Sequence, residues 1–328
     1  MIAAMLARLR SHRRCVGVDL GATSIKVVRV DLERGRPSHA LACVRPTPRG
    51  AFESYRISDP SALGEVLRDA LGEIRARDMP IAIALPAPAV MIKRLQLGRG
   101  ELRRVAERVR TEIETVMPEH RDELAFDFQI VGDTPSAGAV EVLVAGARRE
   151  LIESYKKAAA EARARLAVLD LDYFALQNAI EWHPQPPTGG GVLLLHGGFR
   201  YTVLNVVVGG RSLFTTAIEL GARSLASGEL GQSGEGGMAE FIAGFCDDVH
   251  HTLNFYCSFV RERPLEATIL SGGLAHVPGL AEALSARLGN TVRILSPLPK
   301  EIVATAELVR QPELAVAAGL ATRAVGDQ

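Results

Sequence analysis

The hydrophobic residues of the chain fall into short continuous runs, which are typical of buried strands, and into stripes with helical spacing. Ser58-Asp59-Pro60 is a helix start, because a capping side chain precedes a proline in the first turn. The helix that follows carries an apolar stripe made of Leu63, Val66, Leu67, Leu71 and Ile74. The apolar run 80–85 then predicts a buried strand, which Pro86 and Pro88 end. The first lobe therefore begins as three strands, a helix and a fourth strand.

The patterns that follow predict a small module and then a second lobe. Strand patterns at 91–97, 126–131 and 140–145, with a helical stripe over 102–116, indicate an α+β module at 91–148. The remaining predicted helices are 149–166, 174–182, 238–259, 278–288 and 313–324, and the remaining strands are 167–171, 193–205 (two strands), 214–220, 267–270 and 292–295. The order of the first half returns in the second, and a repeat of this length indicates duplicated domains. We expect an α/β fold with two lobes.

One segment in each half has the same form, an apolar strand, a tight turn with glycine and a second apolar strand. The first turn is Asp19-Leu20-Gly21-Ala22-Thr23-Ser24, and the second is His196-Gly197-Gly198-Phe199-Arg200. Turns of this kind direct backbone N–H groups toward one point and can surround a phosphate. The two turns, one from each lobe, could hold a polyphosphate between them.

The two turns differ at one position, where Asp19 aligns with His196. A carboxylate at the end of a buried strand is costly unless it is paired, and Mg²⁺ or its water shell would satisfy it. Lys26 lies one hairpin strand further on, where it either contacts phosphate or is a solvated charge. The alternative is an ordinary hairpin with an aspartate in its turn.

Composition excludes several classes of protein. The 328 residues are 47% hydrophobic and carry no net charge, and only 5% are aromatic, so we expect no nucleic-acid partner. The cysteines at 15, 43, 246 and 257 form no Cys-x-x-Cys pair, which argues against a disulfide framework or a zinc site. No apolar run reaches the roughly 20 residues of a membrane span.

The first 14 residues combine an apolar face with a basic cluster. Met1, Ile2, Met5, Leu6 and Leu9 share a helical face, and Arg8, Arg10, Arg13 and Arg14 follow. This pattern is either a short amphipathic helix that rests on an anionic membrane or a partner, or a solvated leader.

A third glycine-containing segment, 269–280, combines a buried strand with Gly272-Gly273-Leu274 and a short helical turn. The glycines would let an adenine and a ribose lie against the backbone. Together the three segments resemble those of the actin-like ATPase fold shared by actin, sugar kinases and heat-shock chaperones. In that fold the first phosphate turn, the second phosphate turn and the adenosine loop follow this order.

Within this fold the chain resembles the PilM family of type IV pilus assembly proteins over nearly its whole length. The resemblance rests on the basic leader, 16–30, the insert 91–148, 254–260 and 271–280. It implies an actin-like (ribonuclease H-like) α/β fold, with 15–171 as the first lobe and 172–311 as the second. A shortened insert at 222–255 and a helix at 312–328 that returns to the first lobe complete the expected domains.

The resemblance also implies partners and a place in the cell. Members bind ATP with Mg²⁺ between the lobes, here through Asp19, Gly21, Ala22, Thr23, Ser24, Lys26, His196, Gly197, Gly198, Gly272, Gly273 and Leu274, with Asp19 facing the metal. They hold the N-terminal cytoplasmic tail of the membrane protein PilN in a groove between the first lobe and its insert. We therefore expect a cytoplasmic scaffold at the inner membrane, near other pilus-assembly and motor proteins, with peripheral membrane contact through 1–14.

Two departures from the family pattern weaken the ATPase interpretation. Relatives carry aspartate where this chain has His196, and neutral imidazole is a poor ligand for a hard cation. An imidazolium at low pH could contact phosphate instead, whereas a simpler interpretation is a hydrogen-bonded ring at a strand end. The insert after Gly221 is also short, and only Glu229, Glu235 or Glu240 could replace the acidic residue that helps to hold the nucleoside. These departures predict weak nucleotide binding and slow or absent hydrolysis.

Two other functions of the same fold remain as alternatives. A sugar-type kinase needs a positioned carboxylate base, for which Asp170, Asp172 and Asp247 are the available residues, and the chain has no Asn-Asp pair. A filament-forming actin-like protein is the third interpretation.

Overall fold

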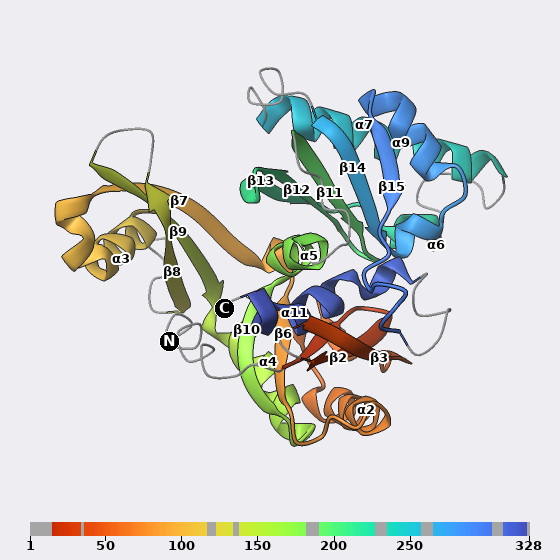
Figure 1. Cartoon of the computed structure of the whole chain (residues 1–328), viewed down its shortest axis with the longest axis horizontal. Coiled ribbons are helices and arrows are strands. Elements are labelled where there is room, and N and C mark those ends of the chain that lie inside the picture. The colour runs from red at the N-terminus through yellow and green to blue at the C-terminus, as the bar shows by residue number, and fades with distance from the viewer. Residues whose placement is uncertain are drawn as a thin grey trace.

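A computed structural model describes residues 15–33, 36–116, 123–133, 138–181, 190–226, 235–256, 265–303 and 311–326. The predictions for the leader 1–14, for Cys257 and for Glu229 lie outside these residues. Two five-stranded sheets of the same topology form the two lobes, and a three-stranded sheet forms a separate module on one side (Figure 1).

The first lobe is a mixed sheet with strand order β10-β6-β1-β2-β3. Its strands are β1 (Val16–Leu20), β2 (Ser24–Glu33), β3 (Arg36–Pro46), β6 (Pro80–Leu85) and β10 (Arg165–Leu171). The first three are antiparallel, and β6 and β10 continue the sheet in parallel with β1. Helices α2 (Pro60–Glu73) and α4 (Arg149–Glu161) pack together, and both contribute to the core of this lobe.

The second lobe repeats this arrangement with strand order β13-β12-β11-β14-β15. Its strands are β11 (Gly191–Gly197), β12 (Thr202–Val208), β13 (Arg211–Ile218), β14 (Leu265–Gly272) and β15 (Thr291–Ile294). Its helices are α6 (Ala222–Ala226), α7 (Glu235–Tyr256) and α9 (Leu280–Leu288). The repeated topology puts β1 and β11, with the turns that follow them, at equivalent places in the two lobes.

Helices α5 (Asp172–Glu181) and α11 (Ala315–Gly326) cross between the two sheets (Figure 1). The crossing is close, because a Cβ atom added at Gly319 would lie 1.7 Å from the carbonyl oxygen of Ala175. A Cβ atom at Gly17 on β1 would lie 1.8 Å from the carbonyl oxygen of Ala317. Only glycine fits at these two positions, which fixes how the helices seat against the first sheet.

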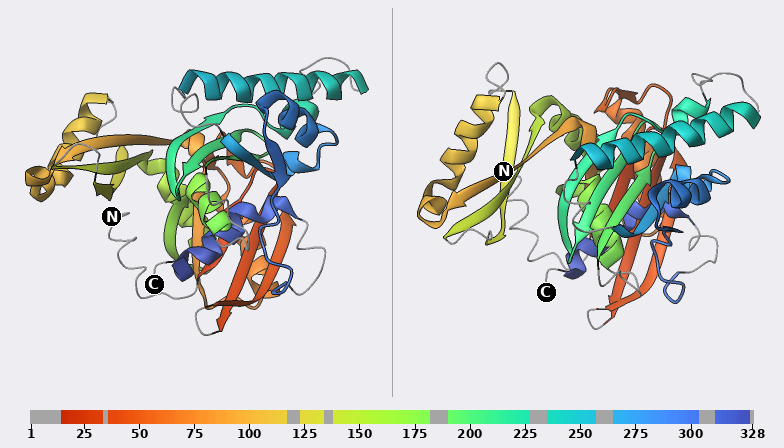
Figure 2. Two further views of the ribbon diagram at one scale, coloured as in Figure 1. Left: turned by 45° about the horizontal axis from the view of Figure 1, so that its top comes forward. Right: turned by 90° about the horizontal axis from the view of Figure 1, so that it is seen from above.

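The inserted module contains β7 (Val90–Gly98), α3 (Val105–Val116), β8 (Leu124–Asp133) and β9 (Ala139–Arg148), with strand order β7-β9-β8. It stands to one side of both lobes in every view (Figure 2). Arg94 on β7 links it to the second lobe, since its guanidinium donates to the carbonyl oxygen of Ser212. Glu141 on β9 pairs with both Arg94 and Arg211, each at 2.8 Å.

Local structure differs from the sequence predictions in two places. The helix predicted over 149–166 ends at Glu161, because Arg163 has a positive φ of 54° and the next strand already begins at Arg165. A small hairpin, β4 (Phe52–Glu53) and β5 (Arg56–Ile57), was not predicted, since two-residue strands leave no periodic pattern.

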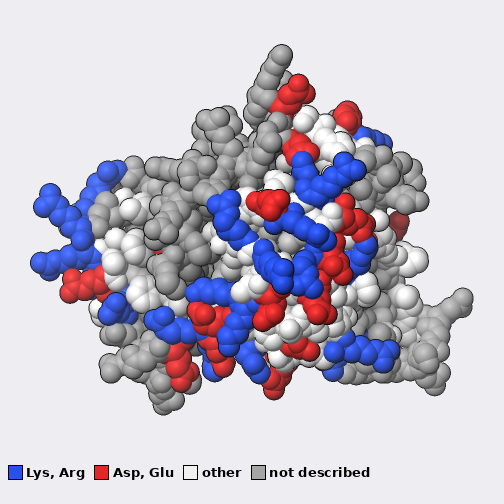
Figure 3. All heavy atoms as spheres, turned by 90° about the horizontal axis from the view of Figure 1, so that it is seen from below, with Lys and Arg blue, Asp and Glu red and all other residues white. Residues whose placement is uncertain are grey.

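Charges of both signs alternate over the face of the molecule drawn in Figure 3. Elsewhere in the described chain, opposite charges pair on the surface of the helices, such as Arg45 with Glu73 on α2, and Lys156 with Glu153 on α4 at 2.7 Å. Among the helices that the structure describes, none has the length and apolarity needed to cross a lipid bilayer.

Candidate functional site

The first turn brings a carboxylate and an ammonium group together. Asp19 ends β1 and lies directly opposite Lys26 on β2 in the antiparallel register. Lys26 Nζ donates to Asp19 Oδ2 at 2.9 Å, and the two side chains are only 11% and 17% exposed. Lys26 is therefore not the solvated charge that one of the two interpretations of the sequence expected. The carboxylate that was expected to face a metal ion already has a cationic partner.

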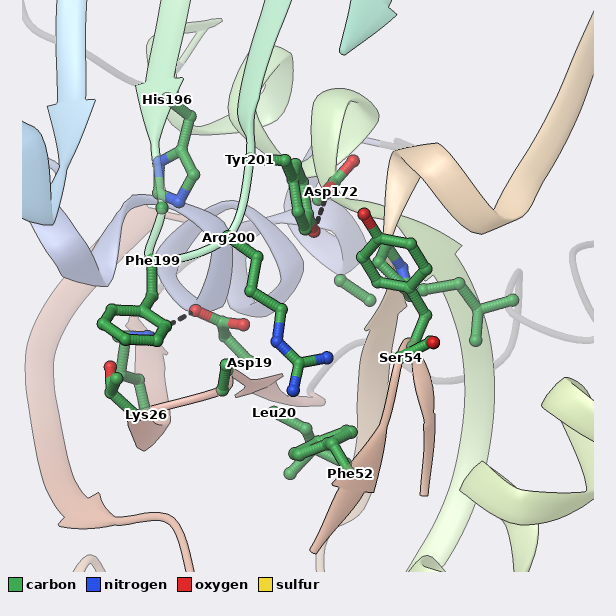
Figure 4. Close-up of a pocket in the computed structure, with 18 of the residues that line it drawn as sticks. Asp19, Leu20, Lys26, Phe52, Ser54, Asp172, His196, Phe199, Arg200 and Tyr201 are labelled. Atoms are coloured by element: carbon green, nitrogen blue, oxygen red, sulfur yellow. Dashed lines mark hydrogen bonds and ion pairs between the residues drawn. The ribbon is translucent and has the colours of Figure 1, made fainter. Parts of the chain in front are cut away.

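The second turn has the same backbone geometry as the first. The N–H of Gly21 donates to the carbonyl of Ser24 at 3.1 Å, and the N–H of Gly198 donates to the carbonyl of Tyr201 at 2.9 Å. The same glycine–carbonyl bond closes each turn, so the two segments are structural equivalents. They face each other across the space between the lobes (Figure 4).

His196 is buried and neutral at the end of β11. Its Nδ1 lies 3.0 Å from Ser271 Oγ, which itself donates to the carbonyl of Leu195 at 3.1 Å. Because a serine hydroxyl has one proton, Nδ1 donates to Ser271. Burial lowers the pKa of His196 to about 4, so no imidazolium is available near neutral pH. This agrees with the simpler interpretation of the sequence, in which His196 is a hydrogen-bonded ring at the end of a strand.

A small pocket lies between the two turns. Seven of the sequence-predicted residues line it: Asp19, Gly21, Ala22, Thr23, Lys26, His196 and Gly198. Phe52 and Tyr55 from the β4–β5 hairpin and Phe199, Arg200 and Tyr201 from the second turn also line it, and Figure 4 shows Arg200 extending into it beside Asp19. The space inside is about 100 Å³.

The other predicted residues do not line this pocket. Ser24 follows the first turn, and Leu274 is fully buried in the core of the second lobe. Gly197 and Gly272 are neighbours in the parallel register of β11 and β14, and a Cβ atom at Gly272 would lie 2.4 Å from the carbonyl oxygen of Gly197. Gly197 and Gly272 thus serve close packing at the junction of the two strands, whereas a Cβ atom at Gly273 would come no closer than 4.0 Å to its nearest neighbour, the carbonyl oxygen of Gly197. Their contact with a nucleoside remains a prediction.

Asp172 at the start of α5 connects the pocket to the inserted module. Its Oδ2 accepts from the hydroxyl of Tyr201 at 2.7 Å and from the N–H of Ala87 at 3.1 Å. Burial raises the pKa of Asp172 to about 6 despite these hydrogen bonds. Asp172 is one of the three carboxylates named above as a possible kinase base, and here its Oδ2 is occupied by Tyr201 and Ala87.

These residues do not fit a magnesium-bound nucleotide in the arrangement described. Asp19 is paired with Lys26, the opposite wall offers a neutral imidazole, and the side chains of Arg200 and Tyr201 fill space beside the second turn. Within the described ranges, no three His, Cys, Asp or Glu side chains form a group that could hold a metal ion.

A second pocket lies between the inserted sheet and the first lobe. Its lining comes from β8, β9, β10, the end of β6, the start of β7 and the start of α5. It is mainly apolar: Leu85, Val90, Phe128, Leu143, Ala145, Gly146, Ala147, Leu169, Leu171 and Phe174. Asp127, Gln129 and Asp170 also line it. We call this pocket the insert groove.

The duplicated sheets, the crossing helices and the paired turns place the chain among proteins of the actin-like ATPase fold. A solved structure titled "PilM-PilN type IV pilus biogenesis complex" has a TM-score of 0.83 and 25% identity to this chain, over 95% of this chain and 98% of that one. The family model described as "Type IV pilus assembly protein PilM" matches residues 17–230. The chain belongs to the PilM family of type IV pilus assembly proteins.

More distant structures share the fold alone. The ethanolamine utilization protein EutJ from Carboxydothermus hydrogenoformans has a TM-score of 0.55 at 16% identity, over 94% of this chain and 88% of that one. An inorganic polyphosphate/ATP-glucomannokinase from Arthrobacter sp. strain KM has a TM-score of 0.52 at 15% identity, over 95% and 98%.

Proposed function

We propose that this protein is a scaffold of type IV pilus assembly that binds the N-terminal cytoplasmic tail of PilN in the insert groove. The observation that carries this proposal is an apolar groove between the first lobe and the insert, in a chain similar to a PilM–PilN complex over 95% of its length. The scaffold would act at the cytoplasmic side of the inner membrane, together with other pilus-assembly and motor proteins.

The geometry of the groove suits an extended peptide. Both β8 and β10 are edge strands, because within the described residues β8 pairs only with β9 and β10 pairs only with β6. Residues of both strands line the groove. An edge strand has free backbone donors and acceptors on one side, and a peptide can add to it while its side chains enter apolar pockets.

The cleft between the lobes supports a structural role better than catalysis. Asp19 and Asp172 are the carboxylates among the described residues that line it, and both are engaged, with Lys26 and with Tyr201. Neither is free to act as the base that a sugar-type kinase requires. We therefore propose that nucleotide binding is weak and that hydrolysis is slow or absent.

A calorimetric titration tests the scaffold proposal. The full chain is titrated with a peptide copying the cytoplasmic tail of PilN from the same organism, with a scrambled peptide as the control. We expect saturable binding of the native sequence only. Absence of binding, or equal binding of the scrambled peptide, would reject the proposed function.

A further inference from the structure

The insert groove contains a buried carboxylate oxygen without a partner. Asp127 is 5% exposed, and its Oδ1 accepts from the N–H of Phe128 at 2.8 Å. Its Oδ2 has no hydrogen-bond partner among the described residues. An unpaired buried carboxylate is costly, so a side chain of this kind is favoured where something else supplies the missing donor.

The alternation of β8 places this carboxylate on the groove side of the inserted sheet. Phe126 and Phe128 pack into the core of the module itself, with Val109 and Val142. Residues on opposite faces of a strand alternate, so Asp127 lies on the other face. Ala125, two residues before Asp127, packs against the core of the first lobe.

Small residues keep space open in front of Asp127. Ala145 is its cross-strand neighbour on β9, and Ala147 lies on the same face two residues further on. Both alanines line the groove, and larger side chains there would fill the space between β9 and the first lobe. Asp127 therefore lines the groove, and because its Oδ2 is itself buried, a pairing side chain has to enter the space beside the two alanines.

The charge of the groove has one sign. Of the described residues that line it, only Asp127 and Asp170 are charged, and Asp170 Oδ1 accepts from the N–H of Leu171 at 2.8 Å. The remaining lining is apolar apart from Gln129. An apolar surface in which the Oδ2 of Asp127 lacks a donor complements an apolar segment that carries a basic side chain.

We propose that Asp127 anchors the partner peptide by pairing its free Oδ2 with a lysine or arginine of that peptide. This inference rests on the proposed function, and it adds the residue that selects the peptide and the chemical class of the side chain selected. Apolar neighbours of the basic residue would fill the alanine-lined space beside it. Desolvation of the pair makes the interaction depend on charge at this position.

A double-mutant cycle tests the pair in the full chain. Calorimetry compares wild type, Asp127→Asn and the matched control Asp69→Asn, an exposed carboxylate on α2, against the tail peptide. Further peptides replace each lysine by norleucine or each arginine by citrulline, one at a time. We expect Asp127→Asn to weaken binding about 10- to 100-fold and Asp69→Asn to leave it unchanged. One of the neutralised peptides should bind wild type about as weakly as the native peptide binds Asp127→Asn. The same neutralised peptide should bind Asp127→Asn no more weakly than the native peptide does.

Thermal melting separates an anchoring role from a structural one. Asparagine keeps the acceptor for Phe128 and removes the unpaired charge, so Asp127→Asn should melt no lower than wild type. The anchor would be overturned if Asp127→Asn bound the tail peptide within twofold of wild type, or if the losses from the protein and peptide changes were additive. It would also be overturned if Asp127→Asn lost binding and melted at a lower temperature than wild type. If wild type itself binds no tail peptide, the proposed function fails and the anchor fails with it.

Discussion

Two buried side chains on the walls of the cleft respond to pH in opposite ways. The pKa of Asp172 is raised to about 6 and that of His196 is lowered to about 4, in both cases because burial disfavours the charged form. Between pH 4 and 6 the folded protein holds a proton on Asp172 that the unfolded chain has released. In nearly the same range the unfolded chain holds a proton on His196 that the folded protein lacks. The two contributions to pH-dependent stability therefore oppose each other.

Replacing Asp172 by asparagine should reveal its share of this balance. The wild-type contribution of Asp172 is fully present below pH 4 and is lost as pH rises through 6, by up to about 3 kcal/mol from the shift to about 6. Asparagine can still accept from Tyr201 or Ala87 and has no charge to bury. We expect Asp172→Asn to raise the free energy of unfolding at pH 8 by about 1–3 kcal/mol relative to wild type, and to change it little at pH 4. Urea unfolding at the two pH values measures this, and an equal difference at both would contradict the assignment.

At the level of elements, the position of α11 depends on glycine. Gly319 lets α11 approach the backbone of α5 so closely that any Cβ atom would overlap the carbonyl of Ala175. Both helices contribute buried residues to the main core, among them Leu176 and Leu320. The crossing of α5 and α11 therefore fixes the positions of the two sheets relative to each other and to the insert groove, which Phe174 of α5 helps to line.

Gly319→Ala should therefore be severely destabilising. Overpacking a rigid contact costs about 1–3 kcal/mol, and we expect the upper end or more here because the overlapping atom belongs to the backbone. Gly244→Ala is the matched control, since it is also a helical glycine and has no atom within 4 Å of the added Cβ. Alanine at 244 should stabilise α7 by up to about 1 kcal/mol. Denaturant unfolding measures the free energy of unfolding of both variants. Similar values for Gly319→Ala and Gly244→Ala would show that α5 and α11 can move apart to make room for the added methyl group.

The sequence predicted the repeated topology, because long apolar strands and paired glycine turns leave strong patterns. One of its two interpretations of His196, a hydrogen-bonded ring at a strand end, is the arrangement found. It missed the small hairpin that carries Phe52 and Tyr55 into the pocket, since such short strands have no period. It did not predict the pairs Lys26–Asp19 and Tyr201–Asp172, because rotamers and cross-strand partners are decided by tertiary packing. The free carboxylate oxygen of Asp127 depends in the same way on which neighbours β8 meets.

At the scale of the whole molecule, the cleft and the insert groove share one structural connection. Asp172 accepts from Tyr201 in the second lobe and from Ala87, which begins the short turn that leads into β7 of the insert. Glu141 bridges the insert and the second lobe through Arg94 and Arg211. The lobes are thus tied together at the start of α5 and through the insert by side chains of the chain itself, which favours one arrangement of cleft and groove without a nucleotide between the lobes.

Magnesium ATP should consequently add little stability. A ligand raises the free energy of unfolding in proportion to the logarithm of one plus the ratio of its concentration to its dissociation constant. Asp19 would have to leave Lys26 before it could face a metal ion. With ATP and Mg²⁺ at about 1 mM, we expect a gain below about 0.5 kcal/mol, as for a dissociation constant near or above that concentration. Thermal melting with and without the nucleotide measures it, and Asp19→Ala is the control for binding in the cleft. A gain well above 1 kcal/mol that Asp19→Ala abolishes would show that the cleft opens to a nucleotide and that the ties at the start of α5 and through the insert are not the whole support of the lobes.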